Sequence, residues 1–275
     1  MKSICNLHTH CTFCHGKATM EEMTKAAIDA GYRYLGFSSH NPTGFDFDRI
    51  QVKQQDIQPY FDEIDRLNAV YGDRIRIFKA FEVESRNAWG TKPVMFEQTD
   101  YNIGSVHWLE IDGQYHAIDS SVEKFENLVK AAESVERVWK QYFEEVSSYA
   151  EGSDYEIAGH LDLISKFNQV TGMFDENDRL YRNLALECVE RVVRAGKIVE
   201  VNLGAMNNGY RSQPYPSRFM LERAKELGAK VIISTDAHVT GKIAMNVEWA
   251  EDYLRSLGFS SVVQLDESGW TEREL

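Results

Sequence analysis

The sequence predicts an α/β fold in which helices surround a parallel sheet, and it favours a closed barrel over an open sheet. Short runs rich in β-branched and aromatic residues alternate with amphipathic stretches along the whole chain. Such alternation is typical of right-handed βαβ units around a parallel sheet. Roughly seven such units fit the chain. Its 275 residues are also a length that α/β barrels commonly reach as one unit.

The elements in the first half of the chain are bounded by helix caps and glycine stops. Thr19 and Glu22 have the spacing of a capping box, and Gly31 follows the end of the helix that they begin. A second helix ends at Gly72 in the same way. In chain order we expect a strand at 3–7, a helix at 19–30, a strand at 34–38, a helix from about 55 to 71, and strands at 75–83 and 101–106.

The second half repeats the pattern, with Gly196 and Gly228 each separating a helix from the strand that follows it. No internal repeat, low-complexity tract or linker divides the chain, so we predict one barrel domain over residues 1–275. In chain order we expect a long helix at 122–149, a strand at 155–158, a helix at 178–195, a strand at 198–202, a helix at 216–227, a strand at 230–235, a helix near 243–257 and a strand at 261–265.

The composition is that of an ordinary globular protein, with 43% apolar and 27% charged residues. Thirty basic against 43 acidic residues give a net charge of −13, which argues against a sequence-independent nucleic-acid binder. An anionic substrate would therefore need a local positive feature such as bound metal. No apolar run is long enough to predict a membrane span, and the N-terminus has no apolar signal core, so we expect a cytoplasmic protein with four free thiols.

Residues of the types that bind metals follow most of the predicted strands. Because the carboxyl ends of parallel strands share one face of a barrel, these residues are expected to meet in one pocket. The pairs His8-x-His10 and Asp236-x-His238 each place two side chains on the same side of an extended segment, where both can hold one ion. The residues at the strand ends are His8, His10, His40, Glu82, His107, His160, Asp236 and His238.

A single histidine after a strand is usually a core or loop residue, but the histidines act here as a set. Seven of the eight lie in this pattern when His15, on the loop after His10, is included. Only His116 is left over, and it is expected at the surface. Imidazole and carboxylate ligands suit zinc, iron or manganese. Glu82 could bridge two ions, and the surplus of ligands over one site predicts two or three divalent metals.

A competing motif lies in the same loop. Cys11-x-x-Cys14-His15 matches the attachment signature of c-type haem. The missing export signal and the alternative use of His15 in the histidine set argue against haem. The same cysteines lack the second half of a zinc knuckle, and a redox pair remains an open alternative.

These residues and their surroundings resemble the polymerase-and-histidinol-phosphatase (PHP) superfamily, in particular its histidinol-phosphatase branch. The resemblance spans nearly the whole chain. It rests on the segments LHTH at 7–10, CHG at 14–16, Glu22, GFSSH at 36–40, FEV at 81–83, GSVH at 104–107, GHLDL at 159–163, EVN at 200–202 and STDAH at 234–238.

The resemblance implies a distorted (β/α)7 barrel with a trinuclear metal site at the carboxyl ends of the strands. It also implies cationic contacts to a substrate phosphate. Arg211 is the best candidate, and Lys166 could replace a family arginine that is not matched at Ser165, although lysine offers a point charge in place of a fork. By analogy, His8, His10, Glu82 and Asp236 would hold the first metal, Glu82, His107 and His160 the second, and His15, His40 and His238 the third.

The function that this resemblance implies is phosphomonoester hydrolysis, with L-histidinol phosphate as the expected substrate. A hydroxide between two metals would attack phosphorus, Arg211 would neutralise phosphate charge, and Asp236 or His238 would protonate the leaving oxygen. Three alternatives stay open. They are a phosphoesterase for another ester or a nucleic-acid end, an amidohydrolase-type enzyme, and a metal-storage or haem protein without catalysis. The oligomeric state is not predicted.

Overall fold

The computed structural model describes residues 4–45, 50–88 and 94–275, so the Ser3 end of the first expected strand lies outside the described residues. Seven strands form one sheet in the order β1-β2-β3-β4-β7-β8-β9. Each neighbouring pair is parallel, which confirms the predicted parallel sheet. The strands are β1 (Cys5–Asn6), β2 (Tyr34–Phe37), β3 (Arg76–Glu84), β4 (Tyr101–Ser105), β7 (Ile157–Ala158), β8 (Ile198–Asn202) and β9 (Val231–Ser234).

The sheet nearly closes into a barrel because its first and last strands meet beyond their carboxyl ends. Thr9 and Ala237 form a parallel bridge, and the backbone N–H of His10 donates to the carbonyl of Ala237 at 2.9 Å. The side-chain amide of Asn6 donates to the Thr235 hydroxyl at 2.6 Å. The segments that close the barrel are therefore the two His-x-His and Asp-x-His segments singled out in the sequence.

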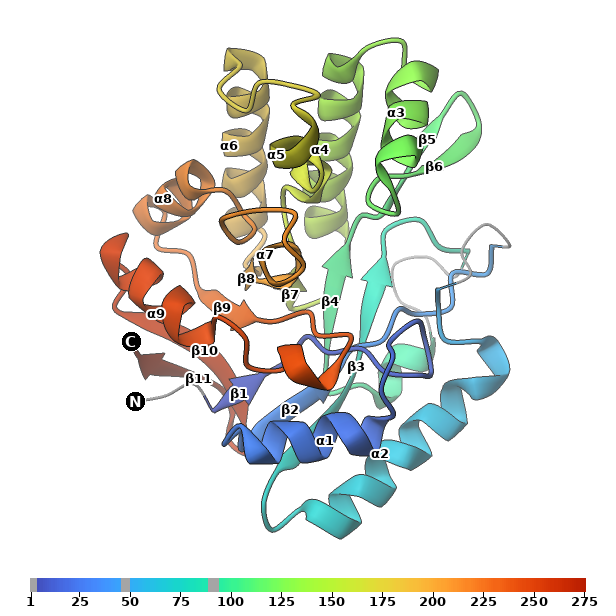
Figure 1. The fold of residues 1–275 in the computed structure, drawn as a ribbon, viewed down its shortest axis with the longest axis vertical. Helices are drawn as coiled ribbons and strands as arrows, with labels where there is room; N and C mark the ends of the chain where they lie inside the picture. The colour runs from blue at the N-terminus through green and yellow to red at the C-terminus, as the bar shows by residue number, and fades with distance from the viewer. Residues whose placement is uncertain (1–3, 46–49, 89–93) are drawn as a thin grey trace.

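Helices cover the outside of the sheet (Figure 1). Helices α4 and α6 pack against each other at the top of this view, and α1 and α2 lie together at the bottom. No helix in the described ranges is both long enough and apolar enough to cross a membrane. The α-helices are α1 (Met20–Asp29), α2 (Ile57–Tyr71), α3 (Val122–Ala131), α4 (Val135–Gly152), α5 (Asn168–Thr171), α6 (Arg179–Arg194), α7 (Gly204–Asn207), α8 (Arg218–Glu226) and α9 (Val247–Ser256). The 3-10 turns are η1 (Gln54–Asp56), η2 (Val94–Gln98), η3 (Leu163–Ser165) and η4 (Thr240–Lys242).

Apolar side chains fill the barrel and the space under the helices. A small cluster that includes Leu7, Tyr101 and Ile232 gathers residues from several strands of the sheet. A much larger cluster packs the helices onto the outer face of the sheet. The interior of the barrel is thus a packed core, and polar side chains gather at the carboxyl ends of the strands.

The prediction of one long helix at 122–149 is wrong. The chain forms α3 and α4, separated at Glu133, whose φ of 63° cannot continue a right-handed helix. The hydroxyl of Ser134 then accepts from the backbone N–H of Arg137 at 3.2 Å and caps a new helix. Two helix starts were also placed too early, since α8 begins at Arg218 and α9 at Val247.

The expected strand at 261–265 exists but does not belong to the barrel. It forms β10 (Ser261–Asp266), which pairs antiparallel with β11 (Gly269–Glu274). A second hairpin, β5 (Trp108–Ile111) and β6 (Gln114–Ala117), was not predicted. Its signal was the Asp112-Gly113 pair, whose φ values of 49° and 79° suit a two-residue hairpin turn. His116, expected at the surface, is half-buried in β6.

The packing of the barrel strands depends on a close approach at Gly36 of β2. A Cβ atom there would lie 1.8 Å from the hydroxyl oxygen of Tyr101, which is buried and donates to the carbonyl of Leu7. We expect Gly36→Ala to lower the free energy of unfolding by about 1–3 kcal/mol through overpacking, as measured by urea unfolding. Gly152→Ala is the matched control, because nothing lies within 4 Å of its Cβ position, and an equal loss in both variants would contradict this account.

Candidate metal centre

The nine residues predicted as metal ligands come together at the carboxyl ends of the strands. Ligand atoms of seven of them form three overlapping groups, with the atoms of each group within 4.8 Å of one another. Asp236 Oδ1 lies 3.1 Å from His10 Nε2, and His160 Nε2 lies 2.8 Å from Glu82 Oε1. The groups are His10, His15, His40 and His238; His8, His10 and Glu82; and His40, Glu82 and His107.

Glu82 lies at the middle of the centre, and its two oxygens face different partners. Oε1 is 3.2 Å from His107 Nε2 and 2.8 Å from His160 Nε2. Oε2 is 3.3 Å from His8 Nε2, 3.4 Å from His10 Nε2 and 3.2 Å from His40 Nδ1. The side chain projects from β3 and is almost fully buried. This arrangement matches a carboxylate that offers one oxygen to each of two ions.

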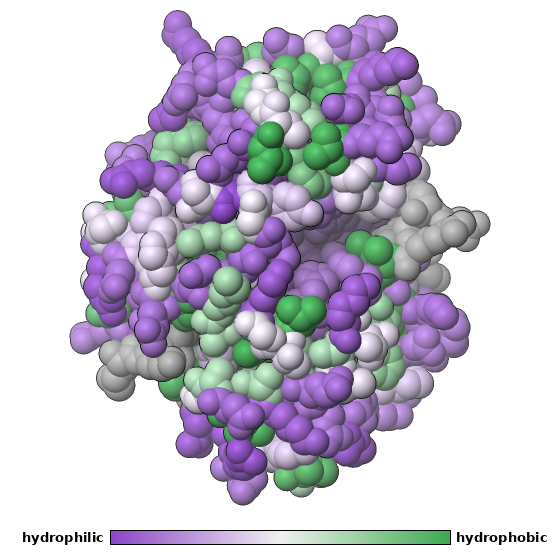
Figure 2. All heavy atoms as spheres, in the orientation of Figure 1, coloured by the Kyte–Doolittle hydropathy of each residue, from purple (hydrophilic) through white to green (hydrophobic). Residues whose placement is uncertain are grey.

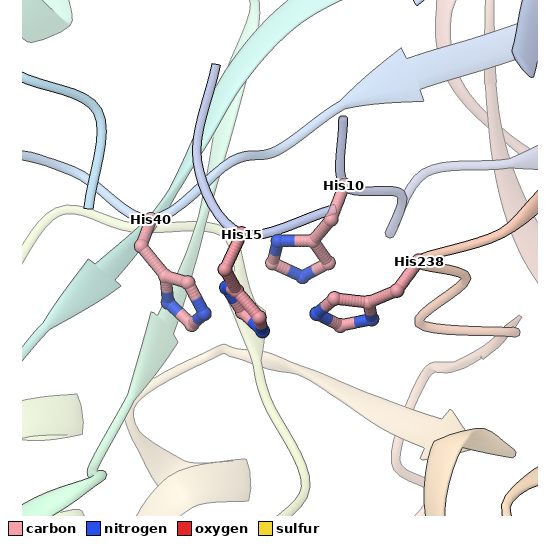
Figure 3. Close-up of side chains that lie close together, drawn as sticks. All are labelled: His10, His15, His40 and His238. Atoms are coloured by element: carbon pink, nitrogen blue, oxygen red, sulfur yellow. The ribbon is translucent and has the colours of Figure 1, made fainter. Parts of the chain in front are cut away.

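Four histidines form the outer part of the centre (Figure 3). His10, His15, His40 and His238 come from separate points of the chain, and their rings surround one shared space. The rings of His10 and His238 stack with centroids 4.1 Å apart, and those of His15 and His40 stack at 5.0 Å. His10 also faces Glu82 and Asp236, so it belongs to both parts of the centre, whereas the family analogy assigned it to the first metal alone.

Two buried carboxylates orient the histidine rings from behind. Glu200 of β8 accepts from His8 Nδ1–H at 2.5 Å and also from the hydroxyl of Ser234 at 2.5 Å. Glu84 of β3 accepts from His107 Nδ1–H at 2.9 Å. Each contact fixes the tautomer that leaves Nε2 free to bind a cation. Neither acid was predicted to have a role, although Glu84 follows Glu82 by two residues and so shares its face of the strand.

The contact from Glu200 predicts a measurable effect on metal binding. We expect Glu200→Gln to weaken metal affinity by about 10- to 100-fold, because the carboxylate behind His8 is lost while the size of the side chain is kept. Competition with a coloured chelator would measure it. Glu187→Gln, which makes the same change on an exposed position of α6, should bind metal like the parent protein, and unchanged affinity in Glu200→Gln would contradict the assignment.

Unsatisfied buried atoms at the centre test whether a cation fits. Within the described part of the chain, the Nε2 atoms of His8, His10 and His238 and Oδ1 of Asp236 are buried and make no well-aligned hydrogen bond. Buried polar atoms are normally paired, so several orphaned ligand atoms within a few ångströms indicate a missing partner with positive charge. The donor set of imidazoles and carboxylates suits divalent transition metals. These imidazoles and carboxylates therefore fit a bound divalent metal.

The electrostatics of the centre point the same way. Burial lowers the pKa of His8 and His107, but the neighbouring carboxylates outweigh it and hold both pKa values well above their usual range. Burial raises the pKa of Glu82, but the surrounding imidazoles lower it well below its usual range, so this side chain stays ionised. Burial lowers the pKa of His238 to about 3. Protons on His8 and His107 thus partly offset the acidic charge, and a bound cation would replace them.

A cavity opens next to these ligands, and of the two predicted phosphate contacts Lys166 lines it whereas Arg211 does not. Lys166 lines the cavity together with His107, His160 and Asp119, and its Nζ donates to Asp119 Oδ2 at 2.9 Å. Burial lowers the pKa of Lys166, but Asp119 outweighs it and raises that pKa. Figure 2 shows a hollow near the centre of this largely hydrophilic face.

Arg211 is placed differently from Lys166. It is buried, and it lines a neighbouring cavity. Its guanidinium donates to the hydroxyls of Ser165 and Ser217, lies 3.6 Å from Asp162 Oδ2 and covers the ring of Tyr215. Tyr215 lines the cavity beside the histidines, so Arg211 lies one layer behind that cavity. Its predicted contact with phosphate stays a prediction.

The cysteines of the competing motif lie beside the centre as free thiols. Cys11 is buried, and its sulfur lies 3.5 Å from the Ser39 hydroxyl. Cys14 Sγ lies 3.5 Å from His10 Nδ1. His15 faces the other histidines, as expected from its alternative use in the histidine set.

Comparison with known proteins places this site in a family context. The family model described as PHP domain matches residues 6–203. A histidinol-phosphatase of Bacillus subtilis is 26% identical over 258 residues, covering 88% of this chain and 96% of that protein. Two solved structures share the fold and confirm the predicted barrel. One is a Listeria monocytogenes protein assigned as a histidinol phosphatase, with a TM-score of 0.78 at 23% identity over 89% of this chain and 99% of that one. The other is histidinol phosphate phosphatase of Lactococcus lactis, solved with zinc, L-histidinol and phosphate, with a TM-score of 0.75 at 18% identity over 98% and 100%.

Proposed function

Because the chain belongs to the PHP domain family, we propose that it is a metal-dependent phosphomonoesterase that hydrolyses L-histidinol phosphate to L-histidinol and phosphate. The observation that carries the proposal is Glu82, whose two oxygens face two separate sets of imidazoles. Two metal ions held close together are typical of sites that hydrolyse phosphate esters, and Glu82 could hold such a pair. The Bacillus subtilis relative and the Lactococcus lactis structure, the latter with its bound products, support this substrate.

The residues that would hold the metals follow the assignment that the family resemblance implies. Two or three ions of zinc, iron or manganese suit this donor set. When bound, such ions lower the pKa of water towards neutrality and offset the negative charge of a phosphate. The ligands would be His8, His10, Glu82 and Asp236 for one ion, Glu82, His107 and His160 for a second, and His15, His40 and His238 for a third.

The side chains around the centre would accept the proton of the attacking water and pass it to the leaving group. Asp236 is ionised, because the neighbouring imidazoles outweigh its burial and hold its pKa well below its usual range, so its carboxylate can accept that proton. As the new P–O bond forms and the ester P–O bond breaks, the same proton can pass to the leaving alkoxide oxygen. His238, with a pKa of about 3, is neutral, which suits a metal ligand better than a general acid.

Substrate binding would use the cations near the cavity. Lys166 lines it directly, and its ammonium has three N–H groups, of which two donate to the backbone carbonyl and the carboxylate of Asp119. The remaining N–H can contact a phosphate oxygen. Arg211 would contribute from behind Tyr215.

The amidohydrolase alternative needs a lysine that bridges metals. Lys79, three residues before Glu82 on the same strand, points to the outside, where its Nζ lies 2.7 Å from Asp65 Oδ2. Its charge is thus used on the surface, and Glu82 would occupy the bridging position. This supports phosphate-ester chemistry over amide hydrolysis.

A substrate screen tests the proposal. The purified protein, with its metal content determined, would be assayed against a panel of phosphomonoesters, short oligonucleotides and amides. We expect L-histidinol phosphate to give the highest kcat/KM, with little release from oligonucleotides and none from amides. A clear preference for another ester, or for an oligonucleotide end, would contradict the proposed substrate but agree with phosphate-ester hydrolysis. Cleavage of amides alone would contradict the proposed reaction.

A further inference from the structure

One ion pair in the cavity has no part in the metal centre. Asp119 follows β6, and Lys166 follows η3. Lys166 Nζ donates both to the backbone carbonyl and to Oδ2 of Asp119, each at 2.9 Å. Both side chains are about one-quarter exposed, at 24% and 22%, and both line the cavity beside the histidines. The pair therefore faces the space where a substrate would lie.

The composition of the cavity wall makes this pair distinctive. Among the described residues that line it, Lys166 is the only lysine or arginine, and Asp119 is the only carboxylate besides Glu82 and Asp236. Of the described residues, only Lys166 donates a hydrogen bond to the carboxylate of Asp119. One oxygen of Asp119 is thus available to a ligand.

Backbone pairing holds Asp119 close to the metal ligands. The N–H of Ile118 donates to the carbonyl of His107 at 2.9 Å, which places the next residue, Asp119, beside the Glu82, His107 and His160 end of the centre. Asp119 also lines the same cavity as His107 and His160. A ligand phosphate seated at that end therefore lies near an aspartate.

An acid beside a phosphate site is unfavourable for a simple phosphate ester, since it repels the dianion. It becomes favourable when the ester carries its own cation close to the phosphate. Resting on the proposed function, we propose that Asp119 is a specificity-determining residue that binds the ammonium of a 2-amino alkyl phosphate while Lys166 binds its phosphate. The ion pair between Asp119 and Lys166 would then be replaced by two pairs with the zwitterionic substrate. Lys166 would pair with its phosphate and Asp119 with its ammonium.

This substrate chemistry fits L-histidinol phosphate, whose ammonium and phosphate are carried on adjacent carbons of one short chain. The pairing with Asp119 also gives Lys166 a selectivity that a lysine alone would lack. A lone cation would favour every phosphate ester equally, whereas a paired one is available at low cost only to a ligand that compensates Asp119. Selectivity then comes from the pair and not from Lys166 alone.

The test compares two esters in four proteins, the parent and three variants. The esters are L-histidinol phosphate and 3-(imidazol-4-yl)propyl phosphate, which lacks only the amino group. In Asp119→Asn we expect kcat/KM for the amino ester to fall about 10- to 100-fold, the loss expected for a charged hydrogen bond, while kcat/KM for the deaminated ester stays equal or rises. Asp119→Glu should restore much of the preference, and Asp62→Asn, at an exposed position of α2, should behave as the parent protein.

The outcomes separate the inference from the proposed function. If the parent protein prefers the amino ester and Asp119→Asn loses that preference, the inference stands. An equal loss for both esters would mean that Asp119 only positions Lys166 or the fold, and it would overturn the inference while leaving the phosphatase intact. No change in either ester would overturn it as well. If the parent protein hydrolyses neither ester but cleaves others, the proposed substrate fails, and the inference fails with it.

Discussion

The variant Glu82→Gln is expected to lose phosphatase activity by about 10³-fold or more in kcat/KM and to lose most of its bound metal. Glutamine keeps the shape of the side chain but offers one neutral oxygen in place of two charged ones. The change therefore takes the ligand oxygen from one half of the centre and leaves the other half only a neutral, weaker one. The halves are His107 and His160 on one side and His8 and His10 on the other. Steady-state kinetics with L-histidinol phosphate and elemental analysis of the purified protein would measure both losses.

The control for this variant is Glu187→Gln, at an exposed position of α6. It should retain the activity and metal content of the parent protein. Circular dichroism would show whether Glu82→Gln is folded, because a buried carboxylate with several histidine partners could also affect stability. A folded Glu82→Gln that keeps full activity and stoichiometric metal would refute the bridging role.

Removing the metal is expected to abolish activity and to lower the melting temperature. Ions bound only by the folded chain stabilise it by about 2.7 kcal/mol at a hundred times the dissociation constant, and the loss corresponds to a drop in Tm of about 5–10 °C. Dialysis against a chelator, followed by thermal unfolding and assay, would show this. Activity should return on addition of a divalent transition metal, and a chelated protein that stays fully active would contradict the account.

The pH dependence of metal binding follows from the same residues. The pKa values of His8 and His107 are raised well above their usual range, so both rings are protonated near neutral pH when no cation is bound. Each must release its proton to become a ligand, so metal affinity should rise with pH by about tenfold per unit for each proton displaced. Metal titration in weak buffer should acidify the solution. Affinity that is flat between pH 6 and 8 would show that no proton is displaced.

Much of the site could be predicted because its ligands follow strands. Once the strands were recognised, parallel pairing brought His8, His40, His107 and His160 to one face regardless of their separation in the chain. The position of Glu82 at a strand end, among so many histidines, then indicated a bridge. The outer carboxylates were harder to find. Glu200 lies within a buried strand, where an acid has no role until the contact with His8 is seen.

Other features depend on contacts that no local pattern encodes. Asp119 and Lys166 meet across 47 positions of sequence, through a hairpin that sequence periodicity did not reveal. The break at Glu133 depends on a single positive φ within a stretch whose helical periodicity continues on both sides. Arg211 was predicted to contact phosphate, but its burial against Asp162 and Ser217 could not be deduced from its position in a loop.

Anomalous X-ray scattering from crystals of the metal-loaded protein tests the bridging role of Glu82 most directly. The account predicts at least two metal peaks, with Oε1 of Glu82 at about 2.0–2.2 Å from one ion and Oε2 at the same distance from another. His107 and His160 would complete the first set, and His8 and His10 the second. A single ion bound through one oxygen of Glu82, or metal bound elsewhere with Glu82 unliganded, would contradict it.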